Sequence, residues 1–286
     1  MIATIGSPIN STRPRIAVSL GERSGLRQNP GRNGPGGGRS GSTRSSFTPL
    51  SLTARRRISR VQGTLFFFRK NFRFDCEAVS TAALLVIAKQ PVAGRAKTRL
   101  TPPCTPQQAA LLADAALRDT LEVVAMTPVD RRVLVFEGDP QAWGAPTGFE
   151  VISQRGAGLG ERLQAAFDDI AQPALLIGMD TPQVTSAQLL AGLRSLTETS
   201  VDSILGPTAD GGYWCVGFRE PVPGAFAGVP MSAADTYVRQ RGRLAELGMR
   251  VGRQPLLRDV DTIDDAKAVA ALAPGSRFAR ALGAIR

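Results

Sequence analysis

The sequence contains no histidine, and this absence excludes several kinds of active site. A Ser-His-Asp or Cys-His triad needs an imidazole to accept the proton of the nucleophile. Histidine is also the side chain whose ordinary pKa lies nearest to neutrality, and it is a common metal ligand. The chemistry of this chain must therefore depend on carboxylates, lysine, arginine, hydroxyl groups and backbone amides. Such oxygen donors suit hard divalent cations, so the cofactor that we predict is Mg²⁺ or Mn²⁺.

Cysteine is scarce as well. Cys76, Cys104 and Cys215 are the only three in the chain, and no two of them have the C-x-x-C spacing of a zinc site or a redox pair. Disulfide frameworks belong mainly to small secreted domains. The cysteine usage therefore predicts a reduced, cytoplasmic protein without a disulfide framework or a structural zinc site.

Sequence signals for membrane insertion or secretion are also missing. The stretch 61–74 (VQGTLFFFRKNFRF) is apolar but interrupted by charge, and it is too short to cross a bilayer. A short strand within the N-terminal segment is the alternative interpretation. No charged region, apolar core and small-residue cleavage site follow one another as in a secretory signal. We therefore predict no membrane span.

Acidic residues are rare in the first 80 positions. Residues 1–80 hold 14 Lys+Arg and 3 Asp+Glu, whereas 81–286 hold 21 of each. The net charge of +11 thus belongs to the N-terminal segment, and we predict no nucleic-acid partner for the rest. The run 31–41 (GRNGPGGGRSG) cannot build a core. We predict a disordered or non-native basic leader over 1–80, whose composition fits an organelle transit peptide or translation from an upstream start, and a folded domain over 81–286.

Short apolar runs alternate with amphipathic segments in that folded domain. Runs such as 82–88 (AALLVIA) and 174–177 (ALLI) are typical of buried strands. Strands that alternate with helices of this length predict an α/β fold, with one Rossmann-like domain, a mainly parallel sheet and helices on both faces. We predict strands over 82–88, 132–136, 149–152, 174–177, 201–205, 215–218 and 249–251, and a loop over 138–148. Helices are predicted over 105–126, 186–196 and 232–247, and another is introduced by the glycines of 154–163 and runs to about 171. A final helix follows a capping box of Thr262 and Asp265.

The loop after the first predicted strand, residues 89–100 (KQPVAGRAKTRL), is rich in cations. A basic, glycine-containing loop between a strand and a helix is a layout that holds phosphate, because backbone N–H groups and the helix N-terminus face the anion. A solvated basic loop beside an edge strand has the same composition. It is not a Walker A motif, since Ala96 rather than glycine precedes Lys97 and Thr98. The four cations of the loop are Lys89, Arg95, Lys97 and Arg99.

Asp180 follows the predicted strand 174–177 in the sequence GMDTP. Ligands of parallel sheets bind at the carboxyl ends of the strands. A carboxylate at this place, fixed by Pro182, is well suited to hold a divalent cation beside a phosphate loop. Aspartate is also common in turns and helix caps for local reasons. We predict that Asp180 is a metal ligand.

Three further aspartates follow later strands. Asp210 precedes Gly211 and Gly212, a pattern typical of a type I′ hairpin turn, whose open backbone can also approach a sugar or a base. Asp259 and Asp261 alternate along an extended segment and so point the same way. These two either supply a second metal contact or form a solvated face ahead of a helix.

Five motifs occur in order along the chain: KQPVAGRAKTRL, QRGAGLGERL, GMDTP, GPTADGGYW and DVDT. In this combination the chain resembles a bacterial family of glycosyltransferase-like proteins in the GT-A, or nucleotide-diphospho-sugar transferase, superfamily. Some members accompany radical SAM enzymes and are named arsenosugar biosynthesis glycosyltransferases. The resemblance covers about residues 82–273 and implies a single GT-A domain with a nucleotide site at the carboxyl edge of the sheet. One departure is Met231 before Ser232, where the family usually has tryptophan.

The resemblance also implies roles for individual residues. By this resemblance the basic loop would bind nucleotide phosphates, Asp180 would take the place of the metal-binding acid of the superfamily, and the segment 210–212 would line the donor or acceptor pocket. From its position in the chain, Asp259 is predicted as a second metal ligand. Catalysis is predicted for Asp210, the best candidate for a base, and for Asp261, the second. The residues predicted to bind the nucleotide are Lys89, Gly94, Lys97, Thr98, Arg99, Gly158 and Gly160, and those predicted to bind the substrate are Gly211, Gly212 and Tyr213.

These features predict a metal-dependent glycosyltransferase that uses a nucleotide-activated sugar and a small-molecule acceptor. The alternative is a nucleotidyltransferase, similar to the guanylyltransferases of cofactor F420 and molybdenum cofactor biosynthesis. There an acceptor phosphate attacks the α-phosphate of an NTP, and the same loop and cation stabilise the charge that builds on phosphate oxygens. Two alternatives come from other classes. One is a nucleotide-binding regulatory protein without turnover, and the other is nucleic-acid binding by the leader, which predicts a steep salt dependence.

Overall fold

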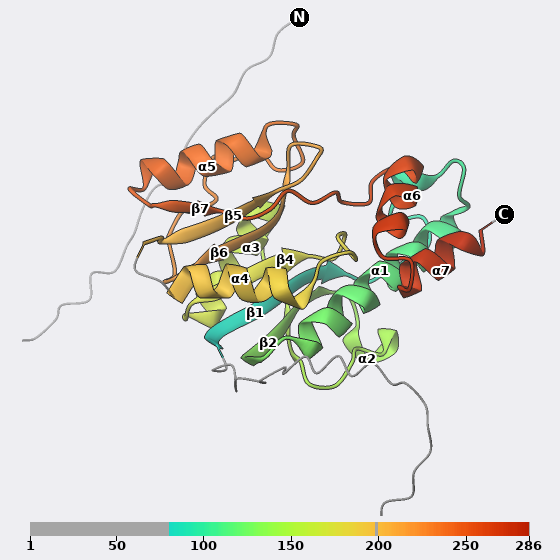
Figure 1. Cartoon of the computed structure of the whole chain (residues 1–286), viewed down its shortest axis with the longest axis horizontal. Coiled ribbons are helices and arrows are strands. Elements are labelled where there is room, and N and C mark those ends of the chain that lie inside the picture. Colours follow the sequence, from blue (N-terminus) through green and yellow to red (C-terminus); the bar gives the residue numbers. More distant parts are fainter. Residues whose placement is uncertain (1–79, 198–199, 286) are drawn as a thin grey trace, which may run out of the picture. The chain divides into compact units, whose positions relative to one another are not determined.

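The computed structural model in Figure 1 describes residues 80–197 and 200–285. The leader predicted over 1–80 therefore lies outside the described residues except for Ser80, and so does the stretch 61–74. None of the helices in the described part combines the length and the apolar composition that crossing a bilayer requires.

Seven strands form one sheet in the order β3-β2-β1-β4-β6-β5-β7. All neighbouring strands are parallel except for β6, which runs antiparallel to β4 and to β5. The predicted mainly parallel sheet is therefore confirmed. The strands are β1 (Ser80–Lys89), β2 (Val129–Glu137), β3 (Glu150–Ser153), β4 (Ala174–Gly178), β5 (Ser203–Pro207), β6 (Tyr213–Phe218) and β7 (Val251–Arg253).

Helices cover both faces of the sheet, as predicted. Helices α1 and α4 contribute buried side chains to the core on one face, and α3 and α5 contribute to the core on the other. The helices are η1, a short 3₁₀ helix (Thr98–Leu100), α1 (Pro106–Met126), α2 (Pro140–Trp143), α3 (Leu159–Ile170), α4 (Ser186–Thr197), α5 (Thr236–Glu246), α6 (Ile263–Leu272) and α7 (Arg277–Gly283).

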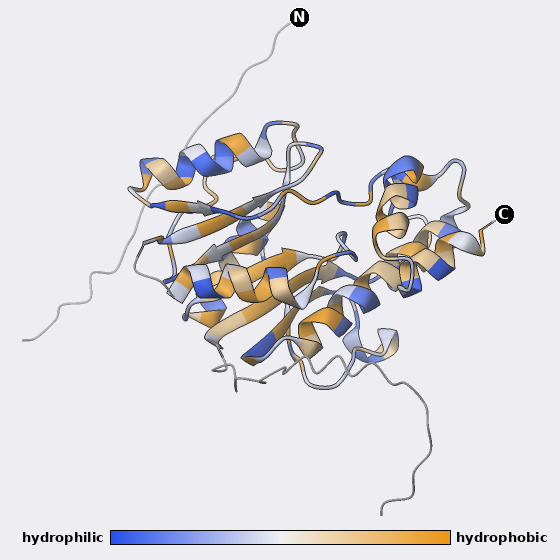
Figure 2. Ribbon diagram, viewed as in Figure 1, coloured by the Kyte–Doolittle hydropathy of each residue, from blue (hydrophilic) through white to orange (hydrophobic). Residues whose placement is uncertain are grey.

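Strand β1 lies in the middle of the sheet and is buried on both sides. Leu84 and Val86 belong to the core under α1 and α4, whereas Ala83 and Leu85 belong to the core under α3 and α5. Burying one leucine side chain stabilises a fold by about 1.5–3 kcal/mol. Figure 2 shows β1 and its neighbour β4 largely in the colours of apolar residues. The loop that follows β1 is thus anchored at the centre of the carboxyl edge.

The C-terminal helices build a third core beside the N-terminal half of α1. Leu100 of η1, Val260 and Phe278 of α7 are all buried in it. The buried carboxylate of Asp119 in α1 caps α7, because it accepts hydrogen bonds from the backbone N–H groups of Arg277 (3.0 Å) and Phe278 (2.8 Å). This packing holds the segment between β7 and α6 across the carboxyl edge of the sheet (Figure 1).

Three details of the secondary structure differ from the prediction. Helix α2 lies inside the predicted loop 138–148, where the Asp139 side chain caps it by accepting from two backbone N–H groups. Helix α5 begins at Thr236 rather than Ser232, because Ser232 has a left-handed backbone with φ 63°. Helix α6, with its predicted capping box, is not the last, since α7 follows it.

Candidate active site

Two adjacent cavities open at the carboxyl ends of β1, β4 and β5. The larger has a volume of about 460 Å³, and its wall includes Asp259 and Tyr213. The smaller, of about 180 Å³, lies under the basic loop. Lys89, Met179 and Asp180 line both cavities, so these residues form the shared wall. The predicted location of the site, at the strand ends, agrees with this arrangement.

The basic loop folds so that one of its cations points inward. A turn forms where the backbone N–H groups of Arg95 and Ala96 both donate to the carbonyl of Val92. Gly94 has φ +77° within this turn, a conformation that glycine adopts without steric cost. Lys97 follows with a left-handed backbone, φ 48°. Its side chain is only 9% exposed.

The Lys97 ammonium lies among oxygen atoms of two distant segments. It is 2.9 Å from Asp180 Oδ1 and 3.4 Å from Asp261 Oδ1, and it donates to the backbone carbonyl of Val260. Burial alone would lower the pKa of Lys97, but the charges of Asp180, Asp261 and Asp259 outweigh it and raise that pKa. Lys97 is therefore a buried cation whose charge is compensated by these carboxylates.

The other cations of the loop lie nearer to solvent. Arg99 is 69% exposed and its Nη1 is 2.8 Å from Asp261 Oδ2. Lys89 Nζ donates to the carbonyl of Arg95 at 3.1 Å. Lys97 and Arg99 thus contact carboxylates in this structure, whereas we expected them to face a phosphate. Thr98 lines the smaller cavity with the loop cations, and the phosphate-binding role of the loop stays a prediction.

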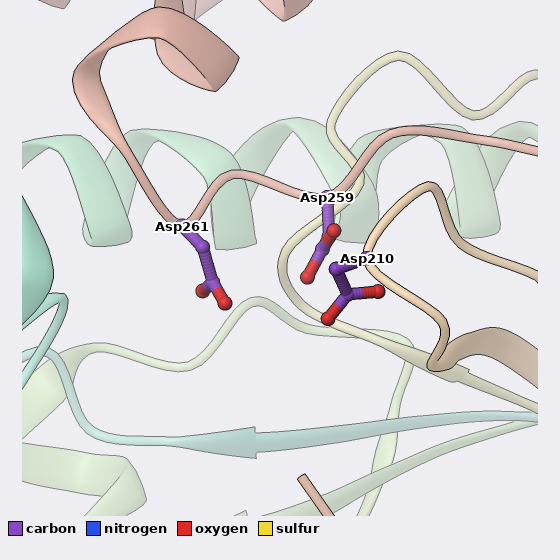
Figure 3. Close-up of side chains that lie close together, drawn as sticks. All are labelled: Asp210, Asp259 and Asp261. Atoms are coloured by element: carbon purple, nitrogen blue, oxygen red, sulfur yellow. The ribbon is translucent and has the colours of Figure 1, made fainter. Parts of the chain in front are cut away.

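Three carboxylates gather beside Lys97. Asp210, Asp259 and Asp261 each offer an oxygen, and these atoms lie within 4.8 Å of one another. Figure 3 shows Asp259 and Asp261 projecting to the same side of the segment that joins β7 to α6, as we predicted, with Asp210 approaching from the β5–β6 hairpin. Burial, followed by the charges of Asp210 and Asp261, raises the pKa of Asp259 to about 6. The three residues are called the carboxylate group below.

Asp180 lies next to the carboxylate group without belonging to it. Its side chain pairs with Lys97, and its backbone carbonyl accepts a hydrogen bond from Val260 N at 3.0 Å. Sequence reasoning assigned Asp180 and Asp259 to a metal and Asp210 and Asp261 to catalysis. The structure instead brings Asp259 together with the two predicted catalytic acids.

The donor chemistry of the carboxylate group fits a hard divalent cation. Within the described part of the chain, Asp210 and Asp259 form no ion pair. Asp261 is the one member of the carboxylate group that does, with Lys97 and Arg99. Carboxylate oxygens are the ligands that Mg²⁺ and Mn²⁺ prefer. A cation at this place would also relieve the mutual repulsion that raises the pKa of Asp259.

The DGG segment forms a turn that differs from the predicted one. A type I′ turn requires a positive φ at Asp210, and among the described residues other than glycine only Lys97, Ala171 and Ser232 have one. Gly211 alone has the positive φ, +91°, and a side chain there would meet the Ala234 carbonyl at 1.8 Å. The type I′ prediction is therefore wrong. The Asp210 carboxylate accepts from Gly212 N at 2.9 Å, which orients it locally.

The residues predicted to bind the substrate and the nucleotide occupy three different places. Tyr213 lines the larger cavity, and burial raises the pKa of its hydroxyl. Gly211 and Gly212 shape the hairpin and line neither cavity. Gly158 and Gly160 line a separate cavity of about 510 Å³ between α3 and the segment after β6. Gly158 and Gly160 therefore do not lie with the carboxylate group.

Sequence reasoning missed a polar wall of the larger cavity. Arg162 Nη1 donates to Glu137 Oε2 at 2.5 Å and to Gln154 Oε1 at 3.2 Å. The Gln154 amide donates in turn to the carbonyl of Ala88 at 2.7 Å. Glu137 ends β2 and Gln154 follows β3. Gln154 and Arg162 belong to the motif QRGAGLGERL, of which only glycines were assigned a role. The rule that ligands bind at strand ends, applied to β2 as well, would have indicated Glu137.

Comparisons with known proteins place the chain among bacterial transferases. Residues 115–233 match the family described as "Uncharacterized protein conserved in bacteria (DUF2064)". The phosphoenolpyruvate guanylyltransferase of Streptosporangium roseum is 32% identical over 189 residues, which cover 64% of this chain and 82% of that protein. A crystal structure from Desulfovibrio desulfuricans G20, of a protein provisionally named a nucleotide-diphospho-sugar transferase, matches with a TM-score of 0.63 and 29% identity, over 72% of this chain and 94% of that chain.

Both similar proteins bear transferase names, and the predicted enzyme class, a transferase, is confirmed. The Desulfovibrio structure also confirms the predicted nucleotide-diphospho-sugar transferase fold. The association with radical SAM enzymes stays a prediction. The chain belongs to the same family as the phosphoenolpyruvate guanylyltransferase of Streptosporangium roseum.

Proposed function

We propose that this protein is a metal-dependent nucleotidyltransferase, which transfers a nucleoside monophosphate from an NTP to a phosphorylated small molecule. The observation that carries the proposal is the meeting of the basic loop and the carboxylate group beside the two cavities, where Asp259 lines the larger and Asp261 lines the smaller. Transfer at phosphorus needs both a cation for the polyphosphate and positive groups around the leaving oxygens. The choice of nucleotidyl transfer is supported by the guanylyltransferase that is 32% identical.

The carboxylate group would hold the divalent cation through Asp210, Asp259 and Asp261, with Asp180 beside it. A bound cation would neutralise phosphate charge and polarise the α-phosphorus. The basic loop orients the triphosphate so that its β- and γ-phosphates enter the smaller cavity, while the larger cavity takes the nucleoside and the acceptor. The cations Lys89, Arg95, Lys97 and Arg99 surround the leaving pyrophosphate.

In this reaction an oxygen of the acceptor phosphate forms a bond to the α-phosphorus, and the bond from that phosphorus to the β-phosphate oxygen breaks. The leaving group is pyrophosphate. An acceptor phosphate is already ionised near neutral pH, so the reaction needs no general base. We therefore assign Asp210 and Asp261 to the cation rather than to proton transfer, which revises the role that the sequence suggested for them.

Glycosyl transfer from a nucleotide sugar is the second candidate, favoured by the name of the Desulfovibrio structure. An acceptor hydroxyl would then need a base, and Asp210 or Asp261 would serve. The leaving group would be a nucleoside diphosphate rather than pyrophosphate. The two candidates thus differ in a product that can be measured.

The test is a product assay on the full chain with Mg²⁺ or Mn²⁺. Each of the four common NTPs is incubated with a panel of phosphorylated carboxylic acids that includes phosphoenolpyruvate, and pyrophosphate release is measured. Parallel reactions contain nucleotide sugars, and nucleoside diphosphate release is measured. Acceptor-dependent pyrophosphate that disappears in Asp259→Asn is the expected result. Nucleoside diphosphate alone would establish the second candidate instead, and neither product would contradict both.

A further inference from the structure

The inner cation of the basic loop already occupies the centre of the acidic site. Lys97 is 9% exposed, and its ammonium lies 2.9 Å from Asp180 and 3.4 Å from Asp261. Asp261 is at the same time a member of the carboxylate group. One carboxylate therefore serves both the lysine and the group that is chemically suited to a divalent cation.

A divalent cation and the Lys97 ammonium cannot both occupy this place without strong repulsion. Like charges a few ångström apart in a partly buried site repel with little screening. The ammonium has somewhere to go, because Lys97 also lines the smaller cavity with Arg95 and Thr98. Anionic phosphates in that cavity would give it a new partner of opposite charge.

We propose that Lys97 is a placeholder cation for the metal site. In the structure the Lys97 ammonium neutralises Asp180 and Asp261. When a divalent cation binds to the carboxylate group and takes Asp261 as a ligand, the ammonium moves to the phosphates of the nucleotide. This inference rests on the metal site of the proposed function. It specifies how the two ligands act there. Metal alone competes with Lys97 for the carboxylates. When both ligands are bound, the metal pairs with the carboxylates and the nucleotide phosphates pair with Lys97.

A fixed structural role for Lys97 makes the opposite prediction. Lys97 also donates to the Val260 carbonyl and so connects the basic loop to the segment that carries Asp259 and Asp261. If this connection were its whole function, removing the amine would loosen the carboxylate group and weaken metal binding. A placeholder, when removed, leaves the acids without a competing cation and strengthens metal binding.

The first experiment is a calorimetric titration of the full chain with Mn²⁺ in the absence of nucleotide. Lys97→Met keeps the aliphatic stem and removes the charge. Its Mn²⁺ affinity should rise by about tenfold or more, where tenfold corresponds to about 1.4 kcal/mol. Lys267→Met is the control, because it removes a lysine charge from α6, outside the site, where the side chain is 66% exposed and contacts Asp264. Its affinity should stay within about twofold of wild type, on the same scale.

The outcomes separate this inference from the proposed function. Unchanged or weaker Mn²⁺ binding by Lys97→Met, with binding abolished in Asp259→Asn, would overturn the placeholder role and leave the metal site in place. An absence of Mn²⁺ binding in wild type and all variants, with or without nucleotide, would overturn both. A larger gain in Lys97→Met than in Lys267→Met supports the placeholder role.

A second experiment uses wild-type protein and so does not depend on how the variant folds. The chain has four lysines, at positions 70, 89, 97 and 267, which permits acylation of each amine to be followed by mass spectrometry. Without metal, Lys97 should react slowly because it is buried and paired. Saturating Mn²⁺ should speed its acylation relative to Lys267, whose side chain is 66% exposed. An unchanged ratio under Mn²⁺ would contradict the movement of the ammonium.

Discussion

The two halves of the described chain contribute opposite charges to the site. The half from β1 to β4 supplies the basic loop, and the half from β5 to α7 supplies Asp210, Asp259 and Asp261. The contact between Lys97 and Asp261 joins them across 164 positions of sequence. Neither half holds both the cations and the carboxylate group. The site therefore exists only when the C-terminal helices hold their segment against the first half.

The strongest way to break this arrangement is to remove the anchor of the acidic half. Phe278 of α7 is 1% exposed in the third core. Phe278→Ala should lower the free energy of unfolding by about 3–5 kcal/mol, because it leaves a cavity in a packed core. Chemical denaturation measures this change, and nucleotide affinity should fall in the same variant. Leu272→Ala in α6, where the side chain is 69% exposed, is the control and should change stability by less than about 0.5 kcal/mol.

A smaller disturbance acts on the hairpin that presents Asp210. Gly211→Ala places a methyl group 1.8 Å from the Ala234 carbonyl and forces alanine into φ +91°. The left-handed backbone alone costs about 1–2 kcal/mol for a residue other than glycine, and the clash adds to it. Gly242→Ala in α5 meets no atom within 4 Å, so it should raise stability by about 0.5–1 kcal/mol through helix propensity. Similar melting temperatures for the two variants would contradict this account of the hairpin.

The smallest expected effect is a pH dependence of stability within the acidic half. The pKa of Asp259 is raised to about 6 in the folded protein, against about 3.9 in an unfolded chain. Its contribution to stability is therefore fully present below about pH 4 and is lost as the pH rises through about 6. In chelator-treated protein, wild type should lose stability over this range relative to Asp259→Asn. Thermal melts at pH 4.5 and 7 check the difference, and parallel curves for the two proteins would refute it.

Local patterns predicted the elements well. The capping box of Thr262 and Asp265 spans four residues of sequence and is present at the start of α6. The central strands were recognisable because both of their faces are apolar, as in β1 and β4. Helix α7 was missed although its N-cap Ser276, which accepts a hydrogen bond from Ala279 N, is a local signal. The second cap, from Asp119, 158 and 159 positions away, depends on tertiary packing and leaves no local signal.

The site could be predicted as a set of residues but not as a set of contacts. Sequence reasoning named Lys97, Asp180 and the carboxylate group, because each follows a strand or lies on the segment before α6. It paired Asp180 with Asp259 as metal ligands, whereas the structure pairs Asp180 with Lys97. The turn at Asp210 was misread because a DG pair is compatible with several turns, and the close approach of Ala234 to Gly211 lies outside the pattern.

The central claim is that a cation joins the nucleotide to the carboxylate group. Calorimetric titration of GTP with and without Mn²⁺ tests it, on wild type, Asp259→Asn and Asp180→Asn, with Asp264→Asn as control, an α6 acid whose side chain is 86% exposed. We predict that Mn²⁺ strengthens GTP binding to wild type and to the control by at least about tenfold, or about 1.4 kcal/mol, and that both site variants lose the gain while their folds survive. A full Mn²⁺-dependent gain in Asp259→Asn would contradict the claim, and a gain kept only in Asp180→Asn would limit Asp180 to its contact with Lys97.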